Sequence, residues 1–120
     1  MKVAVLGASN NPERYSNKAI KMLLAHHHEV IPVNPAQKII DGLAVVASLE
    51  KLPPDVHTIT VYLSPEISSN MKESFLAARP KRVIFNPGAE NPALAQHLKN
   101  AGIETVEACT LVMLSTGVFN

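Results

Sequence analysis

Residues 3–20 read VAVLGASNNPERYSNKAI. The apolar run Val3–Leu6 stops at Gly7, small polar residues and Pro12 follow, and apolar residues then return at helical spacing. A strand that ends in a glycine turn ahead of a helix leaves backbone N–H groups free to face an anion, and phosphate groups bind at such turns. The stretch therefore predicts a strand, a phosphate-binding turn and the first helix of an α/β fold.

The chain as a whole has the composition of a single soluble domain spanning residues 1–120. Hydrophobic residues make up 47% and charged residues 18%, and the formal net charge is +1, which indicates no nucleic-acid or membrane-surface partner. The single cysteine excludes an internal disulfide and is typical of a reducing compartment. No apolar run approaches the roughly 20 residues that span a bilayer, and no signal-peptide pattern is present. We expect a cytoplasmic protein.

Four further segments have the composition of strands. They are continuous apolar runs, or they are rich in β-branched and aromatic residues, as in strands covered on both faces. The predicted strands after 3–7 are Val30–Asn34, His57–Leu63, Arg82–Asn86 and, with a weaker pattern, Ile103–Glu107.

Three amphipathic helices are predicted between these strands, because apolar residues recur there at i, i+3, i+4 and i+7. Their apolar stripes are Ile20, Leu23, Leu24 and His27; Ile67, Met71, Phe75 and Ala78; and Leu94, Ala95 and Leu98. The second helix opens at Ser64-Pro65-Glu66, and the third opens at Asn91-Pro92 and ends before Gly102. Between Pro35 and Pro54 the pattern is poor, and SLEKL predicts only a short helix.

Alternating strands and helices with short connections indicate a parallel sheet with right-handed crossovers. We predict a three-layer, Rossmann-like α/β fold with five parallel strands in the order 3-2-1-4-5. Ligands of such sheets bind outside the carboxyl ends of the strands, where the strand order reverses, here between strands one and four. The loops after Leu6, Val33, Leu63 and Phe85 are therefore the candidate binding loops.

The first loop offers a turn and polar donors but lacks a dinucleotide fingerprint. That fingerprint would need glycine at positions 9 and 12, where the chain has Ser9 and Pro12. The alternative is that the serine and asparagines only cap the helix. The candidate phosphate ligands are Gly7, Ala8, Ser9, Asn10 and Asn11, with Arg14 and Lys18 adding positive charge.

The second loop argues against a dinucleotide cofactor. A dinucleotide site has an acidic residue at the end of strand two for the ribose diol, but this chain has Val33-Asn34-Pro35 there, and Glu29 stands at the other end of the strand. Lys38, with Lys18, could instead meet an extra phosphate on the ribose. The alternative is that Pro35 only ends the strand.

The third and fourth loops carry weaker signals. Ser64 and Pro65 could contact an adenine or ribose, although helix capping explains Ser64 equally well. Asn86-Pro87-Gly88 forms a sharp turn with little side-chain bulk, so that backbone can approach a ligand, although a plain turn explains this sequence about as well.

Five motifs together resemble the small stand-alone CoA-binding proteins, which are similar to the CoA-binding domain of the succinyl-CoA synthetase α subunit and of ADP-forming acyl-CoA synthetases. The resemblance runs in order over nearly the whole chain. It departs at His27, where relatives commonly have glycine, and it is loose over residues 42–47. The motifs are VLGASNNPERYSNKA, HEVIPVNP, the pair Ser48-Leu49, IFNPGAEN and EACTLVML.

The resemblance implies that coenzyme A is the ligand, with its pyrophosphate on the turn of Gly7, Ala8, Ser9 and Asn10. It implies that the adenosine lies near residues 33–35 and against Ser64-Pro65, and that the pantetheine arm passes toward residues 86–88. The 3′-phosphate of CoA agrees with the missing ribose-binding acid. In the synthetases, catalysis uses a phosphorylated histidine and an ATP-grasp module outside this domain.

The chain has no obvious catalytic constellation. His26, His27 and His28 are consecutive and diverge on a helix, so they do not converge on a metal, and His57 and His97 stand alone. Cys109 lies in an apolar run and reads as a buried thiol, although it could lie close enough for a mixed disulfide with the CoA thiol. We therefore expect a non-catalytic binder of CoA or acyl-CoA.

Two other classes of function remain open. The first is an enzyme, either a nucleotide-dependent oxidoreductase or an orphan subunit of an acyl-CoA synthetase. The second is an interaction module that has lost its ligand. The C-terminal run LVMLSTGVF could pack against a second copy in a homo-oligomer or fold back over strand five.

Overall fold

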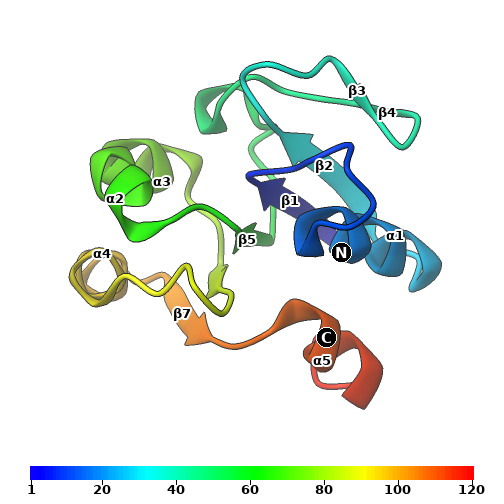
Figure 1. Ribbon diagram of the computed structural model, residues 1–120. Coiled ribbons are helices and arrows are strands. Elements are labelled where there is room, and N and C mark those ends of the chain that lie inside the picture. Colours follow the sequence, from blue (N-terminus) through cyan, green and yellow to red (C-terminus); the bar gives the residue numbers. More distant parts are fainter.

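A computed structural model describes all residues, 1–120, and shows a five-stranded parallel sheet with helices on both faces (Figure 1). The predicted α/β, Rossmann-like fold class is confirmed. The sheet strands in spatial order are β2 (Glu29–Val33), β1 (Lys2–Leu6), β5 (Thr58–Val61), β6 (Arg82–Phe85) and β7 (Glu104–Glu107).

The strand order is 3-2-1-4-5 when the segment around Val46 is counted as the third strand, β5 as the fourth and β6 as the fifth. Val46 forms a single parallel bridge with Val33 on the outer side of β2, which makes the segment around Val46 a rudimentary third strand. The predicted third strand, 57–63, does not lie there. Its ordered part, β5, pairs with β1, so the strand order reverses between β1 and β5.

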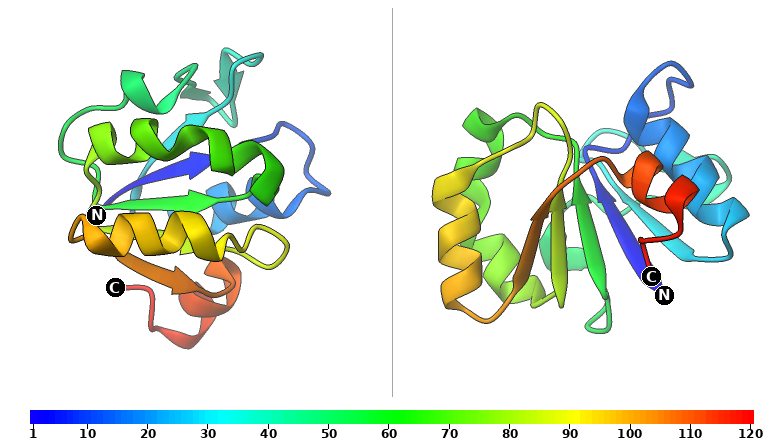
Figure 2. Two further views of the ribbon diagram at one scale, coloured as in Figure 1. Left: turned by 90° about the vertical axis from the view of Figure 1, so that its left-hand side faces the viewer. Right: turned by 90° about the horizontal axis from the view of Figure 1, so that it is seen from below.

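The helices form the outer two layers, as Figure 2 shows from two sides. One layer contains α1 (Tyr15–Ala25) and α5 (Thr110–Thr116), and the other contains α2 (Pro65–Ser68), α3 (Lys72–Ala78) and α4 (Pro92–Asn100). Successive side chains of a strand point to opposite faces, so β1 supplies Val3 and Val5 to the first layer and Ala4 and Leu6 to the second. The sheet is therefore buried on both faces, which explains its continuous apolar runs.

The first and third predicted helices are confirmed with small changes. α1 ends at Ala25, so His27 follows the helix and does not extend its apolar stripe, and Leu24 is 37% exposed. The Asn91 side chain caps α4 by accepting a hydrogen bond from the Leu94 N–H at 3.2 Å, and Gly102 follows with φ of 86°.

The second predicted helix is broken into two helices by a 3₁₀ turn over Ser69–Met71. Ile67 is 53% exposed, so the predicted apolar stripe does not face the core along its whole length. The Asn91 side-chain amide donates to the Ser68 and Ser69 hydroxyls at 2.9 and 3.0 Å, which holds the break in place. Serine and asparagine are weak helix formers, so this tertiary contact overrides the apolar periodicity.

Residues 35–54 contain a hairpin that the apolar pattern alone did not predict. Strands β3 (Ile39–Ile40) and β4 (Leu43–Ala44) pair antiparallel through Asp41 and Gly42, which have φ of 51° and 77°. Asp-Gly between apolar residues is a strong signal for such a turn, and it was present in IIDGLA. The predicted short helix at SLEKL is confirmed as a 3₁₀ turn, η1 (Leu49–Lys51).

The C-terminal run folds back onto the sheet. Met113, Leu114 and Phe119 are buried together with Ile20 and Leu23 of α1, while Val112 and Val118 are 55% and 62% exposed. No helix combines the length and the apolar character needed to cross a membrane.

Candidate functional site

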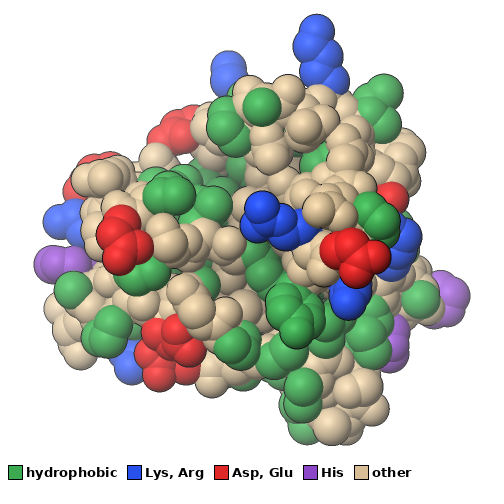
Figure 3. Space-filling view, viewed as in Figure 1, with side chains coloured by type: hydrophobic (Ala, Val, Ile, Leu, Met, Phe, Trp, Pro, Cys, Tyr) green, Lys and Arg blue, Asp and Glu red, His purple; other side chains and the backbone are tan.

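A cleft of about 660 Å³ lies at the carboxyl ends of β1, β2 and β5, which is the predicted edge of the sheet. Figure 3 shows the surface hollowed near the centre of this face, with hydrophobic side chains in the hollow and a basic side chain beside it. Nine of the predicted site residues line this cleft: Gly7, Ala8, Ser9, Asn10, Arg14, Val33, Asn34, Pro35 and Ser64.

A second pocket of about 250 Å³ adjoins the first and shares its wall of Gly7, Ser9, Arg14, Tyr62, Leu63 and Ser64. It extends between the start of α1 and the loop after β6. The predicted residues Pro87 and Gly88 line it, together with Tyr15, Ser16 and Ala89. The two pockets form a bent groove over the point where the strand order reverses, between β1 and β5.

Several lining residues were not predicted. Ile67 and Met71 come from the broken second helix, and Tyr62 and Leu63 from the end of β5. No sequence signal indicated that Ile67 would line the cleft, since it belongs to the predicted apolar stripe of the second helix. The others are Leu6, Gln37, Ala47 and Ser48, and of these only Leu6 and Ser48 belong to motifs of the family resemblance.

Five predicted ligand residues line neither pocket. The Asn11 side chain accepts a hydrogen bond from the Glu13 N–H at 3.0 Å within the turn, and the Lys18 ammonium lies 5.4 Å from the centre of the Tyr15 ring. Lys38 is exposed ahead of the hairpin, and Pro65 is the first residue of α2. The fifth is Asn86, which is buried in a structural network.

Asn86 ties three elements together below the pockets. Its side-chain oxygen accepts a hydrogen bond from the Thr110 N–H at 2.8 Å, and its amide donates to the Thr60 hydroxyl at 2.6 Å and to the Val61 carbonyl at 2.9 Å. Its side chain therefore anchors the start of α5 to β5, and only its neighbours Pro87 and Gly88 reach the groove.

Gly7 is required by the local geometry of the turn. Its φ is 85°, and an added Cβ would lie 2.9 Å from Leu63 Cδ2 and 3.3 Å from the Tyr62 backbone. The N–H groups of Gly7 and Ala8 both donate to the Val33 carbonyl at 3.2 Å. These two amides are therefore already used within the chain.

The amides that remain free lie just beyond Gly7 and at the start of α1. The N–H groups of Ser9 and Asn10 have no acceptor within the chain, and neither have those of Tyr15 and Ser16 in the first turn of the helix. Free N–H groups at a helix start, together with the helix dipole, favour an anion.

The loop that carries these amides is held by side chains of three other segments. The Asn34 amide donates to the Ala8 carbonyl at 2.7 Å, and the Asn10 amide donates to the Gln37 side chain at 2.7 Å. Buried Asn17 donates to the Ser9 carbonyl at 2.8 Å and to Asp41 at 2.9 Å. The unpredicted hairpin therefore helps to fix the loop after β1.

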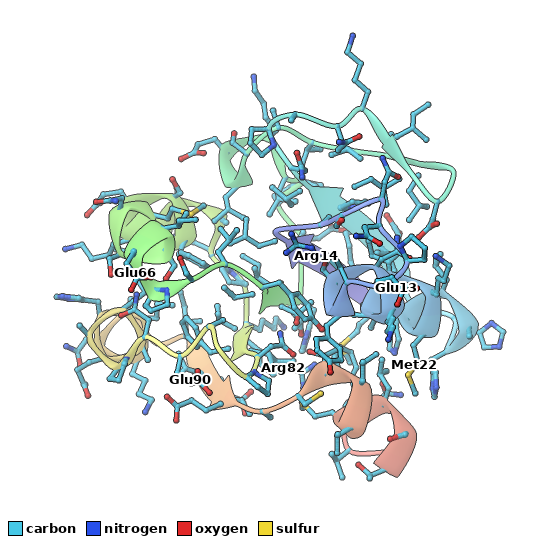
Figure 4. The ribbon with its side chains drawn as sticks, viewed as in Figure 1. Glu13, Arg14, Met22, Glu66, Arg82 and Glu90 are labelled. Carbon is cyan, nitrogen blue, oxygen red and sulfur yellow. The ribbon has the colours of Figure 1, made fainter.

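Arg14 is the only charged residue that lines the groove, and it lines both pockets. Its guanidinium makes no ion pair, and the first turn of α1 contains no acidic residue. In Figure 4 Arg14 lies near the centre of the view, at the start of α1. No Asp or Glu lines either pocket, so the groove has a positive potential.

Tyr62 forms part of both pockets, but its hydroxyl is buried without a hydrogen bond. Burial raises the pKa of Tyr62 to about 12, although the nearby hydroxyls of Thr110 and Thr60 oppose the rise. The phenol is therefore neutral at physiological pH.

No histidine or cysteine lines either pocket of the groove. Cys109, which is partly exposed, precedes α5, and His97 is exposed on α4. His28 is buried against Phe119, and His27 and His57 line a different cleft at the amino end of the sheet. The groove thus offers hydroxyls, amides and one guanidinium, which suits the binding of an anionic ligand.

Comparisons with known proteins agree with this geometry. Residues 1–115 match the family model described as a CoA binding domain. The chain is 29% identical over 101 residues to the uncharacterized protein YneT of Bacillus subtilis (strain 168), covering 84% of this chain and 75% of YneT. A crystal structure of an uncharacterized protein is 40% identical, with a TM-score of 0.90 over 98% of this chain and 97% of that one.

The fold also occurs within a larger enzyme. Our structure covers 25% of the dinucleotide-forming acetyl-coenzyme A synthetase 1 of Ca. Korarchaeum cryptofilum, with 89% of this chain aligned, 19% identity and a TM-score of 0.77. At this identity the likeness shows the fold alone. The family match spans nearly the whole chain, and the parallel sheet and the groove at its carboxyl edge agree with it. The chain therefore belongs to the CoA binding domain family.

Proposed function

We propose that this protein binds coenzyme A or an acyl-CoA in the groove without catalysing a reaction of its own. The observation that carries the proposal is a turn of free amides beside one unpaired arginine in a groove without carboxylates. This is the chemistry that a diphosphate requires.

In this proposal the diphosphate of CoA lies against the free amides of Ser9 and Asn10 and the start of α1, with Arg14 beside it. This differs from the amides first expected, because those of Gly7 and Ala8 donate to Val33. The adenosine would occupy the larger pocket, which has 660 Å³ and apolar walls such as Ile67 and Met71. The pantetheine arm would follow the smaller pocket toward Gly88.

The energetics require all parts of the ligand. A helix dipole contributes about 0.3–1 kcal/mol, and a hydrogen bond to a charged group about 1.5–3 kcal/mol. Micromolar affinity corresponds to about 8 kcal/mol, which is several kcal/mol more than the dipole and any one such hydrogen bond provide. Burial of the adenine between apolar side chains, at roughly 25 cal/mol per Å², must supply much of the remainder.

Isothermal titration with CoA, 3′-dephospho-CoA and NAD tests the proposal. We expect CoA to bind more tightly than NAD, because no residue in the groove can accept hydrogen bonds from a ribose diol as a carboxylate does. Tighter binding of NAD would contradict the proposal. Weaker binding of 3′-dephospho-CoA than of CoA would show that the 3′-phosphate is recognised.

A pair of matched variants tests the position of the diphosphate. Ser9→Asp adds a negative charge beside the free amides, and Asn11→Asp adds the same charge to a neighbouring residue that lines neither pocket. We expect Ser9→Asp to lose at least about tenfold in affinity, or 1.4 kcal/mol, and Asn11→Asp to lose much less. Equal losses would place the diphosphate elsewhere. Gly7→Val is a poor test, because the new side chain would collide with Leu63 and the Tyr62 backbone.

A second candidate function is that of a separate CoA-binding subunit of an acyl-CoA ligase. The observation that favours it is the likeness to one quarter of a dinucleotide-forming acetyl-coenzyme A synthetase. This function requires a partner chain with a nucleotide site. Native mass spectrometry of the protein isolated from its own cells tests it, because a stable heteromeric complex is expected, and recovery of this chain alone would contradict it.

A further inference from the structure

A second cleft, of about 630 Å³, lies at the opposite edge of the sheet from the CoA groove. It is formed by residues at the amino ends of β1, β2 and β5 and by the connections that follow α1 and α3. Its ionisable side chains are Lys2, His27, Glu29, Asp55, His57, Arg79 and Lys81. The proposed function uses none of them.

The charges of this cleft are unevenly paired. Lys2 contacts both carboxylates, Asp55 at 2.7 Å and Glu29 at 3.7 Å, whereas Arg79 and Lys81 contact no carboxylate. Lys2 therefore balances one of the two carboxylates on the acidic side of the cleft, whereas Arg79 and Lys81 on its basic side have no counter-ion within the chain.

A buried arginine behind the cleft adds to this positive charge. Arg82 is 7% exposed, donates to the Phe119 carbonyl at 2.7 Å and to the Thr58 hydroxyl at 3.1 Å, and has no carboxylate within 4 Å. His57 lines the cleft, and its Nδ1 lies 2.8 Å from the same Thr58 hydroxyl that Arg82 contacts. Its Nε2 makes no hydrogen bond within the chain, so it is available to a ligand.

Burial, together with the charges of Arg82 and Lys81, lowers the pKa of His57 below its ordinary value. A bound anion would offset these charges and raise that pKa again.

Two side chains of the cleft occupy backbone positions that favour glycine. His27 is the second residue after α1 and Arg79 the first after α3, and their φ values are 67° and 50°. Of the three non-glycine residues with positive φ, only Asp41 lies outside the cleft, in the hairpin turn. Glycine is the usual residue at this position after a helix. The chain thus holds an imidazole and a guanidinium at the rim of one cleft against the local backbone preference.

We propose that this cleft binds a small organic anion through a phosphate or carboxylate group, held by Arg79, Lys81 and His57 with His27 at the rim. Arginine and lysine bind both anions by charge-assisted hydrogen bonds. The cleft volume lies in the range of small-molecule sites and exceeds what a bare phosphate fills. This site is separate from the CoA groove, since no residue lines both.

Nuclear magnetic resonance of the histidine side chains in the full chain tests the proposal. Inorganic phosphate and succinate are each titrated into the protein, with sodium chloride at matched ionic strength as the control. We expect a saturable shift of the His57 and His27 signals and a raised His57 pKa with phosphate, succinate or both. Saturation by phosphate alone would assign the site to phosphoryl groups, and saturation by succinate alone to carboxylates. The same small, unsaturated shifts with all three salts would overturn the proposal.

Variants separate binding from folding. Arg79→Gly removes the guanidinium and relieves the left-handed backbone, so we expect at least a tenfold loss of anion affinity together with an unchanged or higher melting temperature. Lys81→Gln should also weaken binding, whereas Lys99→Gln on α4 removes an equal charge away from the cleft and should not. Full anion affinity in the Arg79→Gly, Lys81→Gln double variant would overturn the proposal. Titration with CoA should be unchanged in all of these variants, which distinguishes this site from the groove.

Discussion

The side-chain amide of Asn34 donates a hydrogen bond of 2.7 Å to the backbone carbonyl of Ala8. The bond joins the loop after β2 to the loop after β1, at the point where both line the larger pocket. The Asn34 side-chain oxygen also accepts hydrogen bonds from the N–H groups of Ala36 at 2.7 Å and Gln37 at 3.1 Å. One asparagine therefore sets the shape of two binding loops before any ligand arrives.

Replacing Asn34 with alanine should loosen both loops. The change removes three hydrogen bonds at a partly exposed site, so we expect a loss of about 1–3 kcal/mol in the free energy of unfolding. CoA affinity should fall as well, because ordering the loops would then oppose binding. Chemical denaturation and calorimetry measure the two effects. Gln37→Ala, which removes one exposed hydrogen bond to Asn10, is the control and should change stability by less than about 0.5 kcal/mol.

Arg14→Gln should weaken CoA binding without destabilising the fold. The Arg14 guanidinium makes no ion pair, so its loss should leave the melting temperature nearly unchanged. We expect the affinity for CoA to fall by about 10- to 150-fold, since a hydrogen bond to a charged group typically contributes about 1.5–3 kcal/mol. Lys18→Gln removes the same charge from a residue outside both pockets and should have a smaller effect. A larger effect of Lys18→Gln would support the role first expected for that lysine.

Asn86→Ala should damage the fold more than any other single change in the binding loops. Asn86 is 2% exposed, and its loss leaves the buried Thr110 N–H without an acceptor, while the Val61 carbonyl keeps only the backbone N–H of residue 86 at 3.3 Å. The unsatisfied N–H costs about 1–3 kcal/mol and each of the other two lost hydrogen bonds about 0.5–1.5 kcal/mol, so we expect a loss of roughly 2–5 kcal/mol in the free energy of unfolding. Urea denaturation checks this value. A loss below 1 kcal/mol with normal folding would show that Asn86 is not the anchor that its contacts indicate.

Tyr62→Phe should stabilise the protein, because it removes a buried hydroxyl that has no hydrogen bond. We expect a gain of about 1 kcal/mol. Ultraviolet titration offers an independent check, since the pKa of Tyr62 is raised to about 12 by burial and Tyr15 is exposed. One of the two tyrosines should ionise only in strongly alkaline solution, and this late step should be missing in the variant. A destabilised Tyr62→Phe protein would show that the hydroxyl does find a partner in solution.

Two histidines at the amino end of the sheet link stability to pH. Burial lowers the pKa of His28, which lies edge-on to the Phe119 ring at 5.1 Å and has its Nδ1 3.1 Å from the Met1 amino group. Burial also lowers the pKa of His57. Nearby charges act in the same direction, except for Glu104 at His57 and the Met1 hydrogen bond at His28, which oppose it. The charges of Arg82 and the Met1 amino group lower both pKa values, His26 also lowers that of His28, and Lys81 also lowers that of His57.

Because both pKa values lie lower in the folded state, the unfolded chain takes up protons first as the pH falls. The contribution of these histidines to the free energy of unfolding should therefore be greatest above about pH 6.5, the ordinary histidine pKa. It should decrease as the pH falls from that value to the lowered pKa values of the folded state. Below those values this contribution becomes constant. Thermal unfolding at a series of pH values measures the decrease, and His28→Gln should reduce it. A stability that rises as the pH falls through this window would contradict the burial of these groups.

The sequence by itself determined the layers of the fold and the edge at which the groove lies. A continuous apolar strand cannot remain exposed, and a parallel connection has one favoured hand, so VAVLG, VIPVN, HTITVYL and RVIFN had to form a sheet covered on both faces. The glycine turn before α1 predicted the edge of the sheet at which the groove lies, because the turn ends a parallel strand there. The loop after β2, without an acid, indicated the class of ligand.

Only the tertiary structure decided which atoms face the groove. Whether the amides of Gly7 and Ala8 are free depends on the Val33 carbonyl, which is more than twenty residues away in the chain. The place of β5 next to β1 and the bridge of Val46 to Val33 are both contacts between distant segments, and so is the contact of Asn91 with the break after Ser68. The second cleft unites residues of four separate segments. Such long-range contacts leave no local sequence pattern, because they depend on how the helices and loops pack against the sheet.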